Sequence, residues 1–217
     1  MMIADKFFND TISRFPVLEE GGSFYEMAVN LLNNNFKVEA CLLILATWNF
    51  AYFRYVVKEL DINSFRRALE AITPEFYNIQ NEELRSIDFK KQGNDIEKIY
   101  NTLSSFSAIK ATGASKIMHL YNRKLFIMWD RYIRGEKPKK HYQELEIYKN
   151  SYMVYKKYNT DGKGYIQFLQ DMSKLFYNVT FKDNGKTFAK AIDEFNYVSI
   201  TIPYQGLEKK LKKKKKK

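Results

Sequence analysis

The chain has 217 residues, of which 45% are hydrophobic and 16% aromatic, and its formal net charge is +11. A chain of this length and composition can bury a core of its own, which excludes wholesale disorder. Its nine glycines and four prolines are too few for an all-β sandwich built on many tight turns.

The single cysteine and the start of the chain bear on the cellular compartment. Cys41 has no partner within the chain for a disulfide, which fits a reducing environment. The first ten residues lack a basic segment followed by an apolar core, so no secretory signal is predicted. The longest apolar run, residues 40–48, is far shorter than the ~20 residues of a membrane span. We therefore expect an intracellular protein of the cytoplasm, nucleoid or nucleus, with no membrane partner.

The spacing of apolar residues predicts helices along nearly the whole chain. In chain order they cover residues 23–34, 37–60, 61–72, 75–87, 93–109, 142–158, 164–176 and 186–200. Segment 37–60 is apolar on most faces, as is typical of a central buried helix. Asp61 or Ser64 can cap the helix that follows it. The predicted fold is all-α, with residues 1–207 forming one mostly helical domain, or two lobes with a hairpin at 105–134.

Positive charge is concentrated in two segments. Residues 208–217 hold eight lysines and one glutamate, and residues 110–140 hold nine lysines and arginines against two acids. In the first segment like charges repel and nothing apolar drives packing, so we expect a disordered basic tail at 208–217. Both segments favour a polyanion as the partner.

Residues 110–116, KATGASK, come before a short apolar helix and resemble the turn of a helix-hairpin-helix motif. In that motif a glycine-containing turn offers backbone N–H groups to a phosphate. The next part, KLFIMWDRYIR at 124–134, resembles the segment of helix-hairpin-helix DNA glycosylases in which an apolar strand-like run ends in a catalytic aspartate. Asp130 matches that aspartate, and Lys116 falls near the Schiff-base lysine of bifunctional members.

This resemblance implies an all-α glycosylase-like fold and a DNA repair function with duplex DNA, damaged or intact, as the partner. In the catalytic form of the hypothesis a damaged base is flipped into an aromatic-lined pocket and excised. Asp130 would then stabilise positive charge on the sugar or activate a nucleophile, and Lys116 would be the lyase nucleophile. Expected DNA contacts come from Lys110, Thr112, Gly113, Ala114, Ser115, Arg131 and Arg134.

Metal and cofactor sites have little support in the sequence. The only histidines are His119 and His141. Residues 159–170 have the outline of a calcium loop, but Lys163 stands where a ligand belongs and Gln170 replaces the closing acid. We therefore expect no metal and no cofactor.

Each candidate residue also has a structural interpretation. Asp130 can be a helix N-cap or an ion-pair partner of Arg131 or Arg134. Lys116 can be a phosphate contact or a solvated lysine, because a nucleophilic lysine needs desolvation or a neighbouring cation. The alternative functions are a non-catalytic helix-hairpin-helix module that binds nucleic acid and a helical interaction domain that binds an acidic partner.

Overall fold

The structure is a computed structural model, and it describes residues 3–15, 22–181 and 185–214. Within these ranges the chain is helical or irregular and contains no strand, which confirms the predicted all-α class. The helices are α1 (Asp5–Ile12), α2 (Gly22–Asn33), α3 (Lys37–Trp48), α4 (Phe50–Val56), η2 (Val57–Glu59), α5 (Ile62–Ala71), α6 (Thr73–Asn78), α7 (Phe89–Ser104), α8 (Lys110–Tyr121), α9 (Lys139–Tyr142), α10 (Glu146–Lys149), α11 (Gly162–Leu175), α12 (Phe188–Asn196), η3 (Tyr197–Thr201) and α13 (Ile202–Lys214).

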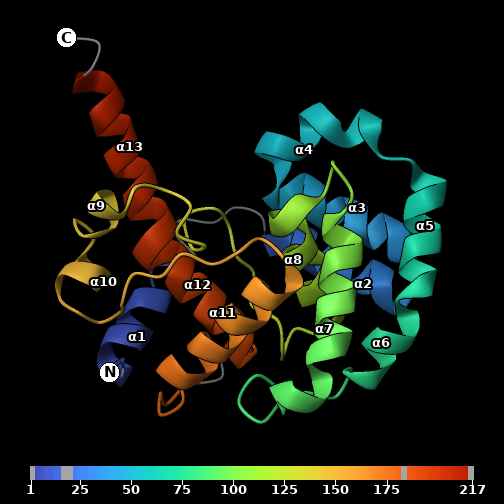
Figure 1. The fold of residues 1–217 in the computed structure, drawn as a ribbon, viewed down its shortest axis with the longest axis horizontal. Coiled ribbons are helices and arrows are strands. Elements are labelled where there is room, and N and C mark those ends of the chain that lie inside the picture. The colour runs from blue at the N-terminus through green and yellow to red at the C-terminus, as the bar shows by residue number, and fades with distance from the viewer. Residues whose placement is uncertain (1–2, 16–21, 182–184, 215–217) are drawn as a thin grey trace.

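The helices form two groups that lie side by side (Figure 1). Helices α2 to α8 make the right-hand group, and α1 joins α9 to α13 on the left because it packs against α12 and η3. Helix α11 packs against α7 and so connects the groups. One cluster of buried hydrophobic side chains extends through both groups, from Ile3 to Tyr204.

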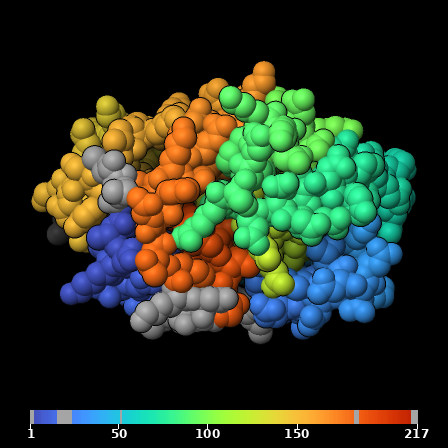
Figure 2. Space-filling view, turned by 90° about the horizontal axis from the view of Figure 1, so that it is seen from below, coloured from blue at the N-terminus to red at the C-terminus, as the bar shows by residue number. Residues whose placement is uncertain are grey.

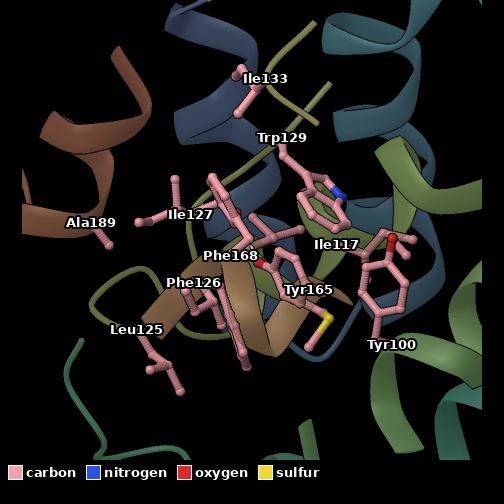
Figure 3. Close-up of a cluster of buried hydrophobic side chains, with 14 of the residues drawn as sticks. Tyr100, Ile117, Leu125, Phe126, Ile127, Trp129, Ile133, Tyr165, Phe168 and Ala189 are labelled. Carbon is pink, nitrogen blue, oxygen red and sulfur yellow. Dashed lines mark hydrogen bonds between the residues drawn. The ribbon is translucent and has the colours of Figure 1, made fainter. Parts of the chain in front are cut away.

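The irregular segment after α8 runs through this core (Figure 3). The side chains of Phe126, Ile127 and Trp129 are at most 1% exposed. Side chains replace the missing helical partners of its backbone: the Tyr165 hydroxyl donates to the Ile127 carbonyl at 2.8 Å, and the Trp129 backbone N–H donates to the Ser115 hydroxyl oxygen at 3.2 Å. Buried backbone polar groups need such partners, so the segment holds a fixed course up to Asp130.

The prediction of one helix over residues 37–60 is wrong. The chain leaves α3 at Asn49, where φ is −121°, and the helical segment Tyr52–Glu59 is bent by 119° from α3. After the bend, Phe53 lies in the core at 5% exposure. In the described ranges, no single helix is long and apolar enough to cross a membrane.

Two other predicted helices are shorter than expected. Helix α6 ends at Asn78, so most of the predicted segment 75–87 consists of turns and irregular chain. Segment 142–158 keeps only the end of α9 and the four-residue helix α10. The aromatic residues that suggested a helix there pack on one another instead, as with Tyr142 and Tyr155, whose ring centroids lie 4.9 Å apart.

The prediction of a disordered tail from residue 208 is wrong for residues 208–214. These residues continue α13, which projects from the body at the upper left of Figure 1. Glu208 anchors this helix, because its carboxylate accepts a hydrogen bond from the Tyr132 hydroxyl at 3.0 Å and pairs with Lys137 at 2.7 Å. Residues 215–217 of the predicted tail lie outside the described residues.

Candidate functional site

The prediction of a glycine turn at residues 110–116 is wrong. These residues form the first two turns of α8. The Gly113 N–H donates to the Ile109 carbonyl at 3.0 Å within the helix. Its φ is not positive, unlike that of Gly135 (72°) and Gly185 (80°). A Cβ at position 113 would lie 2.8 Å from Ile109 Cγ2 and 2.9 Å from Leu45 Cδ2. The glycine therefore permits close packing of α8 on α3 and offers no N–H to a phosphate.

The two residues after Gly113 are also part of the core. Ala114 and Ser115 are both 0% exposed. The Ser115 hydroxyl donates to the Thr112 carbonyl at 3.0 Å and accepts from the Trp129 N–H at 3.2 Å. In this structure neither residue reaches the surface, so the predicted phosphate contacts of Gly113, Ala114 and Ser115 have no route to a duplex.

The connection between α7 and α8 lies earlier in the chain, at residues 105–109. Lys110 follows it with a φ of 50°, an uncommon value for a residue other than glycine. Its side chain is exposed, and its ammonium lies 5.0 Å from the centre of the Tyr52 ring. Arg131 is exposed as well and donates to the Tyr132 hydroxyl at 2.9 Å. Of the predicted contact residues, these two present a cation to solvent.

Arg134 is buried, and its guanidinium donates hydrogen bonds to groups of the protein. It is 5% exposed, and its guanidinium donates to Glu136 Oε1 at 2.6 Å and to the Thr112 hydroxyl at 2.8 Å. The same group lies 5.4 Å from the Trp129 ring. Arg134 therefore ties the start of α8 to the segment after Asp130, and the predicted DNA contacts of Thr112 and Arg134 are replaced by their contact with each other.

Asp130 has the geometry of a cap. Its Oδ1 accepts from the backbone N–H groups of Tyr132 at 2.8 Å and Ile133 at 2.9 Å, and its Oδ2 accepts from the Thr201 hydroxyl at 2.8 Å. No ion pair of Asp130 with Arg131 or Arg134 is present within 4.0 Å in the described part of the chain. The carboxylate thus fixes the loop after residue 130 to η3.

Lys116 also has a structural partner. Its ammonium donates to the Trp48 carbonyl, one of the last carbonyls of α3, which lacks a helical partner of its own. The partners of Lys116 and Asp130 therefore lie on different elements, Trp48 at the end of α3 and Thr201 in η3.

A cavity of about 690 Å³ lies between the two groups of helices, and neither Lys116 nor Asp130 lines it. Its aromatic lining consists of Phe15, Tyr25, Trp48, Phe181 and Phe188, and its charged lining consists of Arg85, Arg123, Lys124, Lys186, Lys190, Glu26, Glu83 and Glu194. In Figure 2 the segment after α8, in yellow-green, reaches the surface beside the green stretch that leads into α7. This volume is in the range of small-ligand pockets.

Cations outnumber acids in this lining, and they differ in their pairing. The three lysines have carboxylate partners: Lys124 with Glu83 at 2.8 Å, Lys186 with Glu194 at 2.8 Å, and Lys190 with Asp193 at 2.9 Å. Arg85 and Arg123 have no carboxylate within 4.0 Å among the described residues. The Arg85 guanidinium lies 3.7 Å from the centre of the Phe188 ring and donates to the Val179 carbonyl. Among the described residues, the charges of these two guanidinium groups are therefore not neutralised by a carboxylate.

Lys190 and Glu194 form the buried side of the cavity. The Lys190 ammonium lies 4.4 Å from the centre of the Trp48 ring and 5.0 Å from that of Phe15, within cation–π range. Burial raises the pKa of Glu194, and the charges of Lys190 and Lys186 act against that rise. The Trp48 ring also stacks on Tyr25 at 4.8 Å. The two lysines thus compensate the Glu194 charge, and within the described part of the chain Arg85 and Arg123 are the cations of the lining without a carboxylate partner.

His119 does not line the cavity but contacts Tyr25, which does. Its Nδ1 lies 2.6 Å from the Phe126 carbonyl, which can only accept, so Nδ1 carries the proton. Its Nε2 then accepts from the Tyr25 hydroxyl at 3.0 Å. Burial lowers the pKa of His119 to about 3, and the positive charges of Lys190 and Arg123 add to the effect. The ring is therefore neutral near pH 7 and holds Tyr25 in place.

The cavity residues were not predicted from the sequence, because they come from six separate segments. One local signal points to them: Lys190, Asp193 and Glu194 are spaced i, i+3 and i+4 on a helix that is otherwise apolar. Such spacing puts the three charges on one face, where buried charge demands partners. Among the described residues, no three His, Cys, Asp or Glu side chains are grouped so that they could hold a metal ion.

No family model, no curated protein and no solved structure matches the chain. The resemblance to helix-hairpin-helix glycosylases thus stays a prediction, and the candidate site rests on its own geometry.

Proposed function

We propose that this protein binds nucleic acid and takes one unstacked nucleotide into the cavity. The observation that carries the proposal is the pair of arginines, Arg85 and Arg123, that line an aromatic-walled cavity without a carboxylate partner among the described residues. Guanidinium groups bind phosphate through paired, charge-assisted hydrogen bonds. The net charge of +11 favours a polyanion over a neutral ligand.

The cavity walls suit the base of such a nucleotide. A nucleotide turned out of a helix loses its stacking, and aromatic side chains can replace part of it. Tyr25, Trp48 and Phe188 provide apolar ring surface, while the exposed Arg85 and half-buried Arg123 provide cations for the attached phosphate. One strand could therefore enter with its base inside and its phosphate at the arginines.

A more specific version of this proposal is excision of the base with Asp130 as the catalytic aspartate. It stays a prediction. The geometry supports the non-catalytic alternative more directly, because all three hydrogen bonds of the Asp130 carboxylate serve the fold. The same holds for Lys116 as a lyase nucleophile, since its ammonium donates to the Trp48 carbonyl.

The test compares two double variants that remove equal charge. Arg85→Ala/Arg123→Ala empties the cavity of its unpaired cations, and Arg66→Ala/Arg67→Ala removes two exposed arginines of α5. The probe is a labelled duplex with one unpaired nucleotide, read by fluorescence anisotropy. Because hydrogen bonds to charged groups are strong, we expect roughly tenfold or greater loss of affinity in the first variant and a small loss in the second.

Equal affinities of the two double variants would contradict the proposal. Mononucleotides serve as competitors in the same assay. Tight binding of a mononucleotide, with no binding of the duplex or of a single strand, would instead identify the cavity as a site for a small phosphate-bearing molecule.

A further inference from the structure

Helix α4, which begins two residues after the cavity residue Trp48, carries an exposed aromatic surface. Phe50 is 54% exposed and Tyr55 is 63% exposed, although large apolar rings are normally covered. Tyr52 lies between them in the sequence and is half-buried. Figure 1 shows α4 at the upper edge of the molecule, at the end of the helical group that contains α8.

Each of these rings has a cation close to it. The Arg54 guanidinium lies 5.3 Å from the centre of the Phe50 ring and 4.6 Å from that of Tyr55, and it donates to the Tyr55 hydroxyl at 2.6 Å. The Lys110 ammonium lies 5.0 Å from the Tyr52 ring. We call Phe50, Tyr52, Arg54, Tyr55 and Lys110 the α4 surface.

The α4 surface is fixed to the rest of the fold at two points. Phe53 is buried in the core, and the Tyr52 hydroxyl donates to the Ser107 carbonyl in the α7–α8 connection at 2.6 Å. Phe50 and the cavity residue Trp48 flank Asn49. The α4 surface and the cavity are thus neighbours in the chain through Trp48 and Phe50.

We propose that the α4 surface is a stacking platform for unpaired bases of a nucleic-acid strand. This inference rests on the proposed function and extends it from one nucleotide to a single-stranded segment. Non-specific single-strand sites combine aromatic rings, on which bases stack, with cations that track the phosphates. Arg54 and Lys110 supply the cations here, and Lys110 distinguishes the surface from one for a protein partner, because lysine is depleted in the core of such interfaces.

The experiment separates stacking from simple apolar contact. Phe50→Leu/Tyr55→Leu keeps apolar surface but removes the rings, whereas Phe50→Trp/Tyr55→Trp keeps ring faces. Tyr77→Leu is the matched control, because Tyr77 is 70% exposed on α6, away from α4. The probe is a labelled single-stranded oligonucleotide, read by anisotropy, with circular dichroism and size-exclusion chromatography on every variant.

We expect the Leu pair to lose at least roughly tenfold in single-strand affinity, since each base–aromatic stack contributes substantially. The Trp pair and Tyr77→Leu should bind like wild type. Wild-type affinity in the folded Leu pair overturns the platform. Loss of a dimer in the Leu pair, with unchanged oligonucleotide binding, also overturns it and assigns the surface to a second copy of this chain.

The outcomes separate the two proposals. A normal effect of Arg85→Ala/Arg123→Ala with no effect of the Leu pair rejects the platform and keeps the cavity. The reverse pattern rejects the cavity and keeps nucleic-acid binding at α4. No binding of either a single strand or a duplex by wild type rejects both.

Discussion

Two regions contain cations and use them differently: the first is residues 111–121 with 129–134, and the second is the lining of the cavity, which includes Arg123. In the first region the charges of Lys116 and Arg134 are directed to protein groups: Lys116 donates to the Trp48 carbonyl, and Arg134 pairs with Glu136. In the second region Arg85 and Arg123 have no carboxylate partner among the described residues. A basic stretch in a sequence therefore does not show which cations can bind a ligand. That depends on which of them are already paired with groups inside the protein.

The two regions also differ in what a substitution should change. In the first region most polar atoms serve packing, so substitutions there should alter stability. Arg85 and Arg123 in the cavity and Phe50 and Tyr55 on α4 have no carboxylate partner or core position among the described residues, so substitutions of these four should alter binding more than stability. His119 connects the regions, because it lies on α8 and holds the cavity residue Tyr25. Three measurements test this division.

The largest expected effect is on acid stability through His119. Its pKa is near 6.5 in the unfolded chain and lowered to about 3 by burial in the folded one. As the pH falls below 6.5, the unfolded chain binds a proton that the folded chain does not, so stability present above pH 6.5 is lost on acidification. By pH 4 the loss from this group is on the order of 3 kcal/mol. Urea unfolding at a series of pH values measures it.

His119→Gln is the control for this prediction. The amide can donate to the Phe126 carbonyl and accept from the Tyr25 hydroxyl, but it does not titrate. We expect the variant to have a flatter dependence of unfolding free energy on pH between 6.5 and 4. The same slope in the variant and the wild type would show that other groups cause the acid loss.

A smaller effect is expected from Gly113→Val. The added side chain would crowd Ile109 and Leu45, and overpacking of a core costs about 1–3 kcal/mol. Because we assign this region to stability, we expect the lower unfolding free energy to appear in urea unfolding. The folded variant should bind the duplex like wild type. If Gly113→Val is as stable as wild type but binds the duplex weakly, Gly113 contacts phosphate. That result would contradict the assignment of this region to stability.

The smallest effect is expected at Asp130. Asp130→Ala should lower the unfolding free energy by about 1 kcal/mol, because it removes a side-chain cap of two N–H groups. Asp130→Asn should stay close to wild type, since the amide oxygen can still cap. Incubation with lesion-bearing duplexes provides the second readout: an excision activity that is present in wild type and abolished in Asp130→Asn would show that the reaction requires the carboxylate.

Some predictions that depend only on near neighbours agree with the structure. Asp61 caps α5, where its side chain accepts from the Asn63 N–H at 3.1 Å. The segment predicted as a helix at 164–176 forms α11 (Gly162–Leu175). Predictions that depend on distant partners do not agree. Gly113 looked like a turn because glycine serves both turns and close helix contacts, and only the position of Leu45 separates the two.

The sequence by itself determined that the chain is helical, because apolar periodicity and caps act within a few residues and need no knowledge of the rest of the fold. The tertiary structure alone decided which polar groups are available. Arg134 is concealed by Thr112 and Glu136, whereas Arg123 reaches a cavity whose walls include Trp48 and Lys190. The physical reason is that a side chain is free or occupied according to what packs around it, and those neighbours come from segments dozens of residues away.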